Sequence, residues 1–217
     1  FNLSNFTPFQ IRLSVASVAT VLIFALFLQL ITVKKVSASE ILEKATISQN
    51  ERINSTIQPV VYQKLKIRSG DSKDLDWEVW NDTEKSRSKQ NIGGEQPKET
   101  INVLQQLSDI LQKNKMNPSK PLSPESFNSW HNSLLKKVDE ITEGDIITFK
   151  TIKQDAAFDW QIVEAIVKFR PNDFHPFEQI IKARISSEEK TFEIYEVNFE
   201  IVSLNTLQPN FFDETPT

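Results

Sequence analysis

The segment DFHPFEQ, residues 173–179, gathers the residue types that carry out acid–base or metal chemistry. Asp173, His175 and Glu178 fall within six positions. A carboxylate beside an imidazole can hold a metal ion or move a proton. A single histidine with two carboxylates is a weak ligand set, however, and Pro176 between two expected strands is typical of a turn. We therefore predict a structural role for these residues and assign no catalytic, cofactor-binding or metal-ligating residue.

Other enzyme signatures fail in the sequence for concrete reasons. The chain has 4 glycines and 0 cysteines, so phosphate-cradling and dinucleotide loops, thiolate zinc sites and a cysteine nucleophile are excluded. A Gly-x-Ser-x-Gly elbow is also missing. His131 stands beside an apolar stripe, where we interpret it as a satisfied or solvent-edge histidine, and alternation directs Glu193 to a solvated face. We expect a protein that is not an enzyme and has no cofactor.

Residues 13–33, LSVASVATVLIFALFLQLITV, contain no charged side chain in a chain that is 25% charged. As a helix they would extend ~31 Å, which matches the ~30 Å hydrocarbon core of a bilayer. We predict a transmembrane helix, Leu13–Val33, that attaches the chain to a membrane. The alternative is a signal peptide cleaved near Ala38, but its apolar region would be only ~7–15 residues long. Residues 1–12 form a short flank, and the start at Phe1 without methionine leads us to expect a fragment.

Basic residues stand on both sides of this helix, with Arg12 before it and Lys34-Lys35 after it. Taken literally, the excess of basic residues would place the C-terminal part inside the cell, but charges upstream of Phe1 would change the count. We expect a single-pass protein of the bacterial inner membrane whose domain, residues 37–217, is extracytoplasmic. That domain has a net charge of about −7 once the three basic residues are removed. This balance argues against binding nucleic acid, or anionic lipid by charge.

The first half of the domain reads as a helix, two or three strands and a second helix. Ser37 and Glu40 fit a capping box, and Pro59 ends the helix that they begin. VVYQKLKI alternates as a half-buried strand, apart from Gln63 on the apolar face, and DWEVW returns as a hairpin. KSRSKQNI is a less regular third strand. INVLQQLSDILQ, residues 101–112, then has the spacing of an amphipathic helix.

The second half reads as one more helix followed by four strands. Ser123-Pro124-Glu125 opens the helix, whose apolar stripe combines five residues: Phe127, Trp130, Leu134, Val138 and Ile141. DIITFKTI, WQIVEAIVKF, FEQIIKARI and KTFEIYEVNFEIV follow as consecutive strands. In the last strand, Phe192 and Ile194 share one phase and Val197, Phe199 and Ile201 share the other. Alternation places Glu196, Asn198 and Glu200 opposite the second set, on a solvated face, and the change of phase near Tyr195-Glu196 predicts a β-bulge.

This order of elements predicts an α+β fold in which helices cover one face of a curved antiparallel sheet, a half-barrel. Such a sheet offers a concave apolar surface where a lipid or a peptide can lie. The alternative is that the same surface is an ordinary core filled by the protein's own side chains.

Several stretches together resemble a known class of proteins: SASEILEKA, VVYQKLKI, WEVW, PLSPESFNSWHNSL, FHPFEQ and FEIYEVNFEIV, in this order. They are similar to the extracytoplasmic domains of bacterial single-pass anti-sigma-factor-like and uncharacterised membrane proteins, and the element order is similar to the RseB and LolA half-barrels. The resemblance implies a sensor or regulatory domain with a protein partner, or alternatively a lipid- or lipoprotein-binding carrier or chaperone. A zinc-binding anti-sigma segment does not occur in this sequence, so sigma-factor binding is assigned to no residue.

Overall fold

A computed structural model describes residues 37–70, 72–93, 98–155 and 158–213 of the chain. The expected transmembrane helix Leu13–Val33 lies outside these residues. In the part that is described, none of the helices combines the length and the apolar character needed to cross a bilayer.

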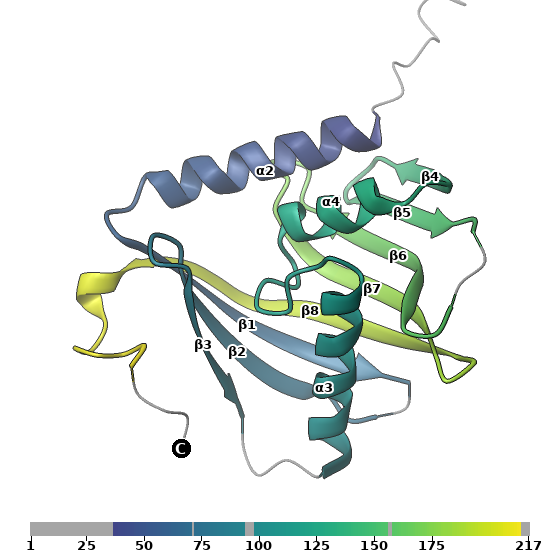
Figure 1. Ribbon diagram of the computed structural model, residues 1–217. Coiled ribbons are helices and arrows are strands. Elements are labelled where there is room, and N and C mark those ends of the chain that lie inside the picture. Colours follow the sequence, from purple (N-terminus) through teal and green to yellow (C-terminus); the bar gives the residue numbers. More distant parts are fainter. Residues whose placement is uncertain (1–36, 71, 94–97, 156–157, 214–217) are drawn as a thin grey trace, which may run out of the picture. The chain divides into compact units, whose positions relative to one another are not determined.

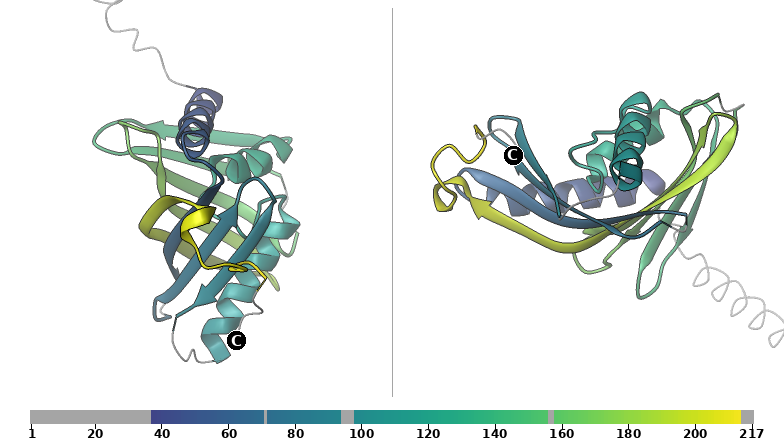
Figure 2. Two further views of the ribbon diagram at one scale, coloured as in Figure 1. Left: turned by 90° about the vertical axis from the view of Figure 1, so that its left-hand side faces the viewer. Right: turned by 90° about the horizontal axis from the view of Figure 1, so that it is seen from below.

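One antiparallel sheet of eight strands organises the domain (Figure 1). Its spatial order is β3-β2-β1-β8-β7-β6-β5-β4, so β3 and β4 form the two edges. The strands are β1 (Pro59–Ser69), β2 (Leu75–Asp82), β3 (Arg87–Ile92), β4 (Lys137–Thr142), β5 (Ile147–Lys153), β6 (Gln161–Phe169), β7 (Pro176–Ile185) and β8 (Glu188–Ser203). The sheet bends around the helices without closing (Figure 2), and the predicted α+β half-barrel is thereby confirmed.

Three α-helices accompany the sheet in the described residues: α2 (Ala38–Asn54), α3 (Lys98–Lys113) and α4 (Pro124–Ser133), with a short 3₁₀ turn, η2 (Leu204–Thr206), at the end. The Ser37 hydroxyl caps α2 by accepting from the Glu40 backbone N–H, as the sequence predicted. Helix α2 crosses one end of the sheet, and α3 and α4 lie inside its curve (Figures 1 and 2). The helices therefore all serve to cover the concave face.

Alternation of side chains decides which face of each strand meets the helices. In β1 the buried phase includes Gln63, Leu65 and Ile67, while Lys64 and Lys66 lie on the other face. The register of β1 places Leu65 opposite Trp77 of β2. Because the period of a strand is two, this register brings the apolar phase of both strands to the concave face.

The predicted bulge in the last strand is confirmed, and it lies at Val197. Lys64 pairs with Asn198, whereas the next residue, Leu65, pairs with Glu196. Val197 is therefore the extra residue, and it is 52% exposed. A bulge lets the strand bend, and β8 is the strand on which the two halves of the sheet meet.

The predicted extent of the third helix is wrong. Helix α4 ends at Ser133, and Leu134 already has extended dihedral angles. Val138 and Ile141 belong to β4, where Val138 pairs with Ile152 of β5. Their spacing fits a helix, but pairing with β5 satisfies backbone groups that would otherwise stand open along this edge. The sheet consequently has one strand more after the helices than the sequence predicted.

Candidate functional site

The concave face carries an apolar interior beneath α3 and α4. Phe127 of α4 packs edge-on against Phe149 of β5 at 5.4 Å between ring centroids. Side chains that are at most 3% exposed line this interior: Leu65, Trp77, Leu107, Ile110, Leu111, Trp130, Val167, Ile181, Phe192 and Ile194. In the described residues the interior is thus filled by the protein's own side chains, which was the alternative left open by the sequence.

Three hydrogen-bond donors are buried in this domain without an acceptor. They are the indole N–H groups of Trp77 and Trp130 and the amide nitrogen of Gln179, none of which has a partner among the described residues. Burying a polar group without a partner costs about 1–3 kcal/mol, so native proteins rarely retain several. Donors of this kind fit the carbonyl or ester oxygens of an amphiphilic ligand.

Helix α3 is attached firmly at its C-terminal end. The Asn114 side-chain amide donates to the Trp160 carbonyl at 2.9 Å, and its oxygen accepts from the Ile162 backbone N–H at 3.1 Å. Near its middle, α3 is linked to the sheet by a polar contact of 3.3 Å between Lys190 Nζ and Gln106 Oε1. Among the described residues, the polar contacts of the helix with the sheet are therefore a bidentate anchor just after its C-terminal end and a weaker side-chain contact near its middle.

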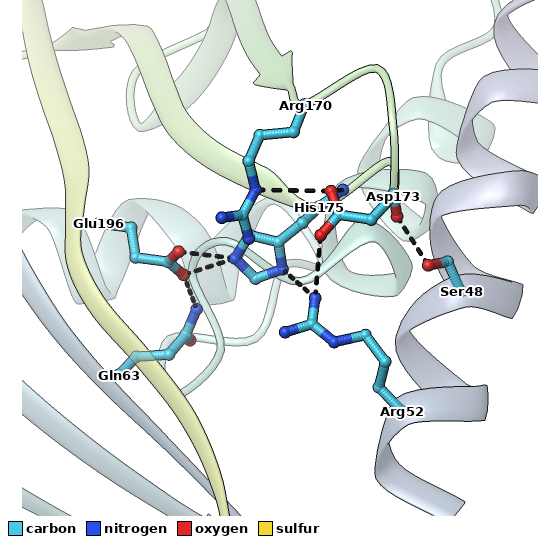
Figure 3. A network of polar contacts seen from close by, with 7 residues as sticks. All are labelled: Ser48, Arg52, Gln63, Arg170, Asp173, His175 and Glu196. Carbon is cyan, nitrogen blue, oxygen red and sulfur yellow. Dashed lines mark hydrogen bonds and ion pairs between the residues drawn. The ribbon is translucent and has the colours of Figure 1, made fainter.

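The histidine segment singled out in the sequence joins a network that binds α2 to the sheet (Figure 3). His175 Nε2 lies 2.6 and 2.8 Å from the two Glu196 carboxylate oxygens. His175 Nδ1 lies 3.4 Å from Arg52 Nη1, and Arg52 also reaches Asp173 at 3.4 Å. Asp173 Oδ1 accepts from the His175 backbone N–H. The sequence-predicted pair Asp173 and His175 is thus brought together.

Glu178, the third residue of that predicted cluster, does not take part. Its carboxylate pairs with Lys168 at 2.8 and 2.9 Å. Successive residues of a strand point to opposite faces, so Glu178 belongs to the convex side while its neighbour Gln179 is buried on the other. Within the described residues, no group of three or more His, Asp or Glu side chains has the geometry to hold a metal ion.

Glu196 is the network residue that the sequence interpretation missed. It was placed opposite Phe199 and Ile201, on a solvated face, because alternation was counted from those residues. If the alternation of side chains is instead counted from Phe192 and Ile194, Glu196 points inward, and the structure agrees, since its side chain is 7% exposed. The bulge at Val197 separates the two phases, so the predicted bulge contained the signal that would have placed Glu196.

The network leaves His175 no free nitrogen. A guanidinium can only donate, so Nδ1 must accept from Arg52, and Nε2 carries the proton that it donates to Glu196. The Phe199 ring packs against the imidazole at 4.4 Å and beneath the Arg52 guanidinium at 4.7 Å. With Arg170 pairing with Asp173, two cations meet two carboxylates. The arrangement is a charge-balanced structural link.

His131 is similarly occupied. Its Nε2 lies 3.0 Å from an Asp139 oxygen, and its ring stacks near Phe127. The side chain is buried. Asp139 also accepts from Thr151 at 2.7 Å, so His131 and β4 are fixed together. This is the satisfied histidine that the sequence predicted.

A cavity of about 460 Å³ opens at the α2 end of the concave face. It is bounded by the C-terminal half of α2, the start of β1, the end of β2 and the segment before α4. Amide side chains dominate its walls: Gln49, Asn50, Asn54, Gln63 and Asn81. This volume lies in the range of small-molecule pockets, about 300–1,000 Å³.

Asp82 fixes the turn beside this cavity. Its carboxylate accepts from the backbone N–H groups of Glu84 and Lys85 and pairs with Arg87 at 2.9 Å. Burial alone would raise the pKa of Asp82, but the Lys85 N–H, the Arg87 guanidinium and the Glu84 N–H outweigh it and hold the pKa below its usual range. The β2–β3 turn that borders the cavity is therefore tied down.

The convex face carries paired polar groups beside aromatic contacts of Trp80 with Tyr62 and Phe211. Burial and a hydrogen bond to Glu78 raise the pKa of Tyr62 to about 12, and a hydrogen bond to Glu193 together with burial raises the pKa of Tyr195 to about 12. Lys150 and Lys182 both lie within 3.6 Å of Glu164.

Comparison with known proteins gives a general likeness. No family model and no curated protein matches the sequence. Among solved structures, the chain is similar to a domain described as outer membrane lipoprotein-sorting from Vibrio parahaemolyticus, with a TM-score of 0.32, 11% identity, and coverage of 79% of this chain and 97% of that one. It is also similar to a LolA superfamily protein from Nitrosomonas europaea, with a TM-score of 0.31, 10% identity, and coverage of 78% and 95%. Scores of this size assign no function, so the proposal below rests on this chain's own residues.

Proposed function

We propose that the domain is a lipid- or lipoprotein-binding half-barrel, a carrier or chaperone rather than an enzyme. The observation that carries this proposal is that the inward side chains differ between the two ends of the concave face. Toward α2 the inward residues include the polar side chains of Gln63, Asn81 and Glu196 on three adjacent strands, beside apolar neighbours such as Val61. Toward the far end they are apolar, with Ile67, Leu75, Phe192, Ile194 and Ile181. A surface of this kind matches a ligand with a polar head and an apolar tail.

An acyl chain enters this interior by taking the place of α3. Moving α3 away uncovers Leu107, Ile110 and Leu111, each 0% exposed, at roughly 1.5–3 kcal/mol each and about 5–9 kcal/mol together. A chain of about 16 carbons gains about 0.8 kcal/mol per buried CH₂ group, or about 12 kcal/mol. The exchange is therefore favourable for a long chain and unfavourable for a short one.

The attachment of α3 defines the direction of this movement. Asn114 holds the C-terminal end to Trp160 and to Ile162 of β6 through both atoms of its amide, whereas Gln106 contacts Lys190 of β8 and Asn102 of its own helix. The helix consequently swings about its C-terminal end. The unpaired indole N–H of Trp77 is a donor that an ester oxygen of the entering ligand can satisfy.

Cross-linking α3 to β8 tests this proposal. The chain has 0 cysteines, so Gln106→Cys together with Lys190→Cys provides a unique pair for a thiol-cleavable bis-methanethiosulfonate linker. Binding of cis-parinaric acid to the full chain is measured by fluorescence before cross-linking, after it, and after reduction. We expect cross-linking to weaken binding at least about tenfold and reduction to restore it.

Each single-cysteine variant treated with the same reagent is the matched control, and it should bind as the untreated protein does. Parinaric acid that binds to an apolar segment outside the half-barrel does so equally in the cross-linked and the reduced protein, so it does not contribute to the difference between them. Unchanged affinity in the cross-linked protein, or no binding before cross-linking, would overturn the proposal.

We further propose that the domain is extracytoplasmic, as expected from the sequence. Protease treatment of intact spheroplasts that carry the full-length protein tests this, because an outer domain is digested and an inner one is protected. The regulatory, anti-sigma-factor-like role expected from the sequence is supported by none of the described residues and stays a prediction.

A further inference from the structure

Two buried amide residues line the cavity at the α2 end, and no described residue donates a hydrogen bond to the amide oxygen of either. Gln63 and Asn81 are 5% and 3% exposed, and both line the cavity. Gln63 pairs with Val79 and Asn81 pairs with Val61, so the two amides are diagonal neighbours on the same face of β1 and β2. Diagonal neighbours in a sheet are about 7–8 Å apart, which lets one small group approach both.

The orientation of each amide is fixed by its partner. Gln63 Nε2 donates to the Glu196 carboxylate at 3.1 Å, and Asn81 Nδ2 donates to the Ser119 backbone carbonyl at 3.0 Å. Both partners can only accept, so the nitrogen of each amide must face its partner and the oxygen must face away. Figure 3 shows the Gln63 nitrogen directed at Glu196.

Neither amide oxygen receives a hydrogen bond from a described residue, and neither is closed off from solvent, since it is not among the fully buried unpaired atoms. Each oxygen belongs to a side chain that lines the cavity. The ligand that satisfies it must therefore bring N–H or O–H donors.

The charges around the cavity specify the ligand further. Glu84 and Glu125 contribute two carboxylates to the lining, against one cation, Lys120. Two acidic side chains beside two neutral acceptors favour a positively charged donor. Ile53 and Val61 supply short apolar walls, which suit the carbon atoms next to such a charge.

We propose that this cavity binds a primary ammonium group, which donates to the Gln63 and Asn81 amide oxygens while the Glu84 and Glu125 carboxylates balance its charge. The group can belong to a free diamine or to the ethanolamine head of a phospholipid. In the second case the inference deepens the proposed function, on which it then rests, because it places a head group at the polar end of the concave face.

Calorimetric titration of the full chain distinguishes the two sources. Putrescine is the probe for a free diamine, and dihexanoyl-phosphatidylethanolamine, used below its micelle concentration, is the probe for a lipid head. Dihexanoyl-phosphatidylcholine is the matched control, because it has the same acyl chains and charges while its quaternary nitrogen has no N–H to donate. Putrescine binding alone identifies a free amine, and a preference for the ethanolamine lipid identifies the head group.

Two variants test the location of binding. Asn54 lies exposed at the end of α2 and lines the cavity, so Asn54→Phe fills the space without touching the Gln63 and Asn81 hydrogen bonds. We expect it to weaken binding of the preferred probe at least about tenfold. Gln112→Phe, on the exposed side of α3, is the matched control and should leave that affinity unchanged.

Absence of binding by both amine probes would overturn the inference, as would equal affinity for the choline and ethanolamine lipids or an undiminished affinity of Asn54→Phe. Each of these outcomes is separate from the parinaric acid result. If parinaric acid binds but neither amine probe does, the head-group inference is wrong and the proposed function stands. If an amine probe binds but parinaric acid does not, the proposed function is wrong and the cavity is a site for a free amine.

Discussion

The anchor of α3 makes a sharp prediction about the substitution Asn114→Ala. The Asn114 amide donates to the Ile110 and Trp160 carbonyls and accepts from the Ile162 backbone N–H. Alanine removes all of these bonds. It also leaves the Ile162 N–H, at the start of β6, without its partner, and the Ile162 residue is 0% exposed.

The expected cost follows from these contacts. Each hydrogen bond between α3 and β6 contributes about 1 kcal/mol, and a buried N–H left unpaired costs about 1–3 kcal/mol. Water that reaches the Trp160 carbonyl recovers part of this loss. We therefore expect Asn114→Ala to lower the free energy of unfolding by about 2–4 kcal/mol.

Urea denaturation measures the change in the free energy of global unfolding, and amide hydrogen exchange measures the change in local stability. Exchange should accelerate along α3 and at the first residues of β6, because the helix loses its firm end. Gln105→Ala is the matched control, since Gln105 is exposed and bonds only to Asp109 on the same helix. A loss below about 0.5 kcal/mol for Asn114→Ala, equal to that of the control, would refute the anchoring role.

Three further predictions concern the acidic groups and the core. The lowered pKa of Asp82 means that its carboxylate stabilises the fold above its unfolded pKa of about 3.9 and loses this contribution as the pH falls through the lower folded value. Between about pH 6 and 2, the urea midpoint of Asp82→Asn should therefore fall less steeply with decreasing pH than that of the unchanged protein. Equal dependence of the two urea midpoints on pH would contradict this prediction. Glu196→Gln replaces the charged acceptor of His175 and should cost about 1–3 kcal/mol, seen as a lower thermal midpoint, whereas an unchanged midpoint would mean that the pair contributes nothing. Phe149→Ala empties a site that is 0% exposed and should cost about 3–5 kcal/mol by urea denaturation; a loss under about 1 kcal/mol would show that the interior is loosely packed.

Local patterns in the sequence predicted most of the fold because the elements carry strong periodicity. The period of two in VVYQKLKI predicted β1, including the placement of Gln63 on the apolar face. The Ser37 and Ser123 caps predicted where α2 and α4 begin. Such signals are local, since a cap or an alternating run constrains only its own neighbours.

Features that depend on distant partners were predicted less well. The end of α4 was misplaced because Val138 and Ile141 continue a helical spacing, while pairing with β5 decides their conformation. Glu196 was assigned to the wrong face because its phase depends on which side of the bulge is counted. Its role also depends on His175, in the segment just before β7, and on Gln63, more than 100 positions earlier in the chain. Contacts across such distances leave no local pattern.

The polar groups on the concave side divide into those that link elements of the domain and those that the two proposals assign to a ligand. Both His131 and His175 have a ring nitrogen bonded to a carboxylate of another element, so each histidine links two parts of the domain. Among the described residues, the amide oxygens of Gln63 and Asn81 and donors such as the Trp77 indole have no hydrogen-bond partner. Amides and indoles do not gain or lose a proton near neutral pH, so under the proposed function they would orient a ligand through hydrogen bonds. The acceptors at the α2 end would bind a donor group of that ligand, and the donors in the interior would bind its acceptor groups. One amphiphilic molecule of the kind proposed would supply both, with an amine at its head and ester oxygens where its tails begin.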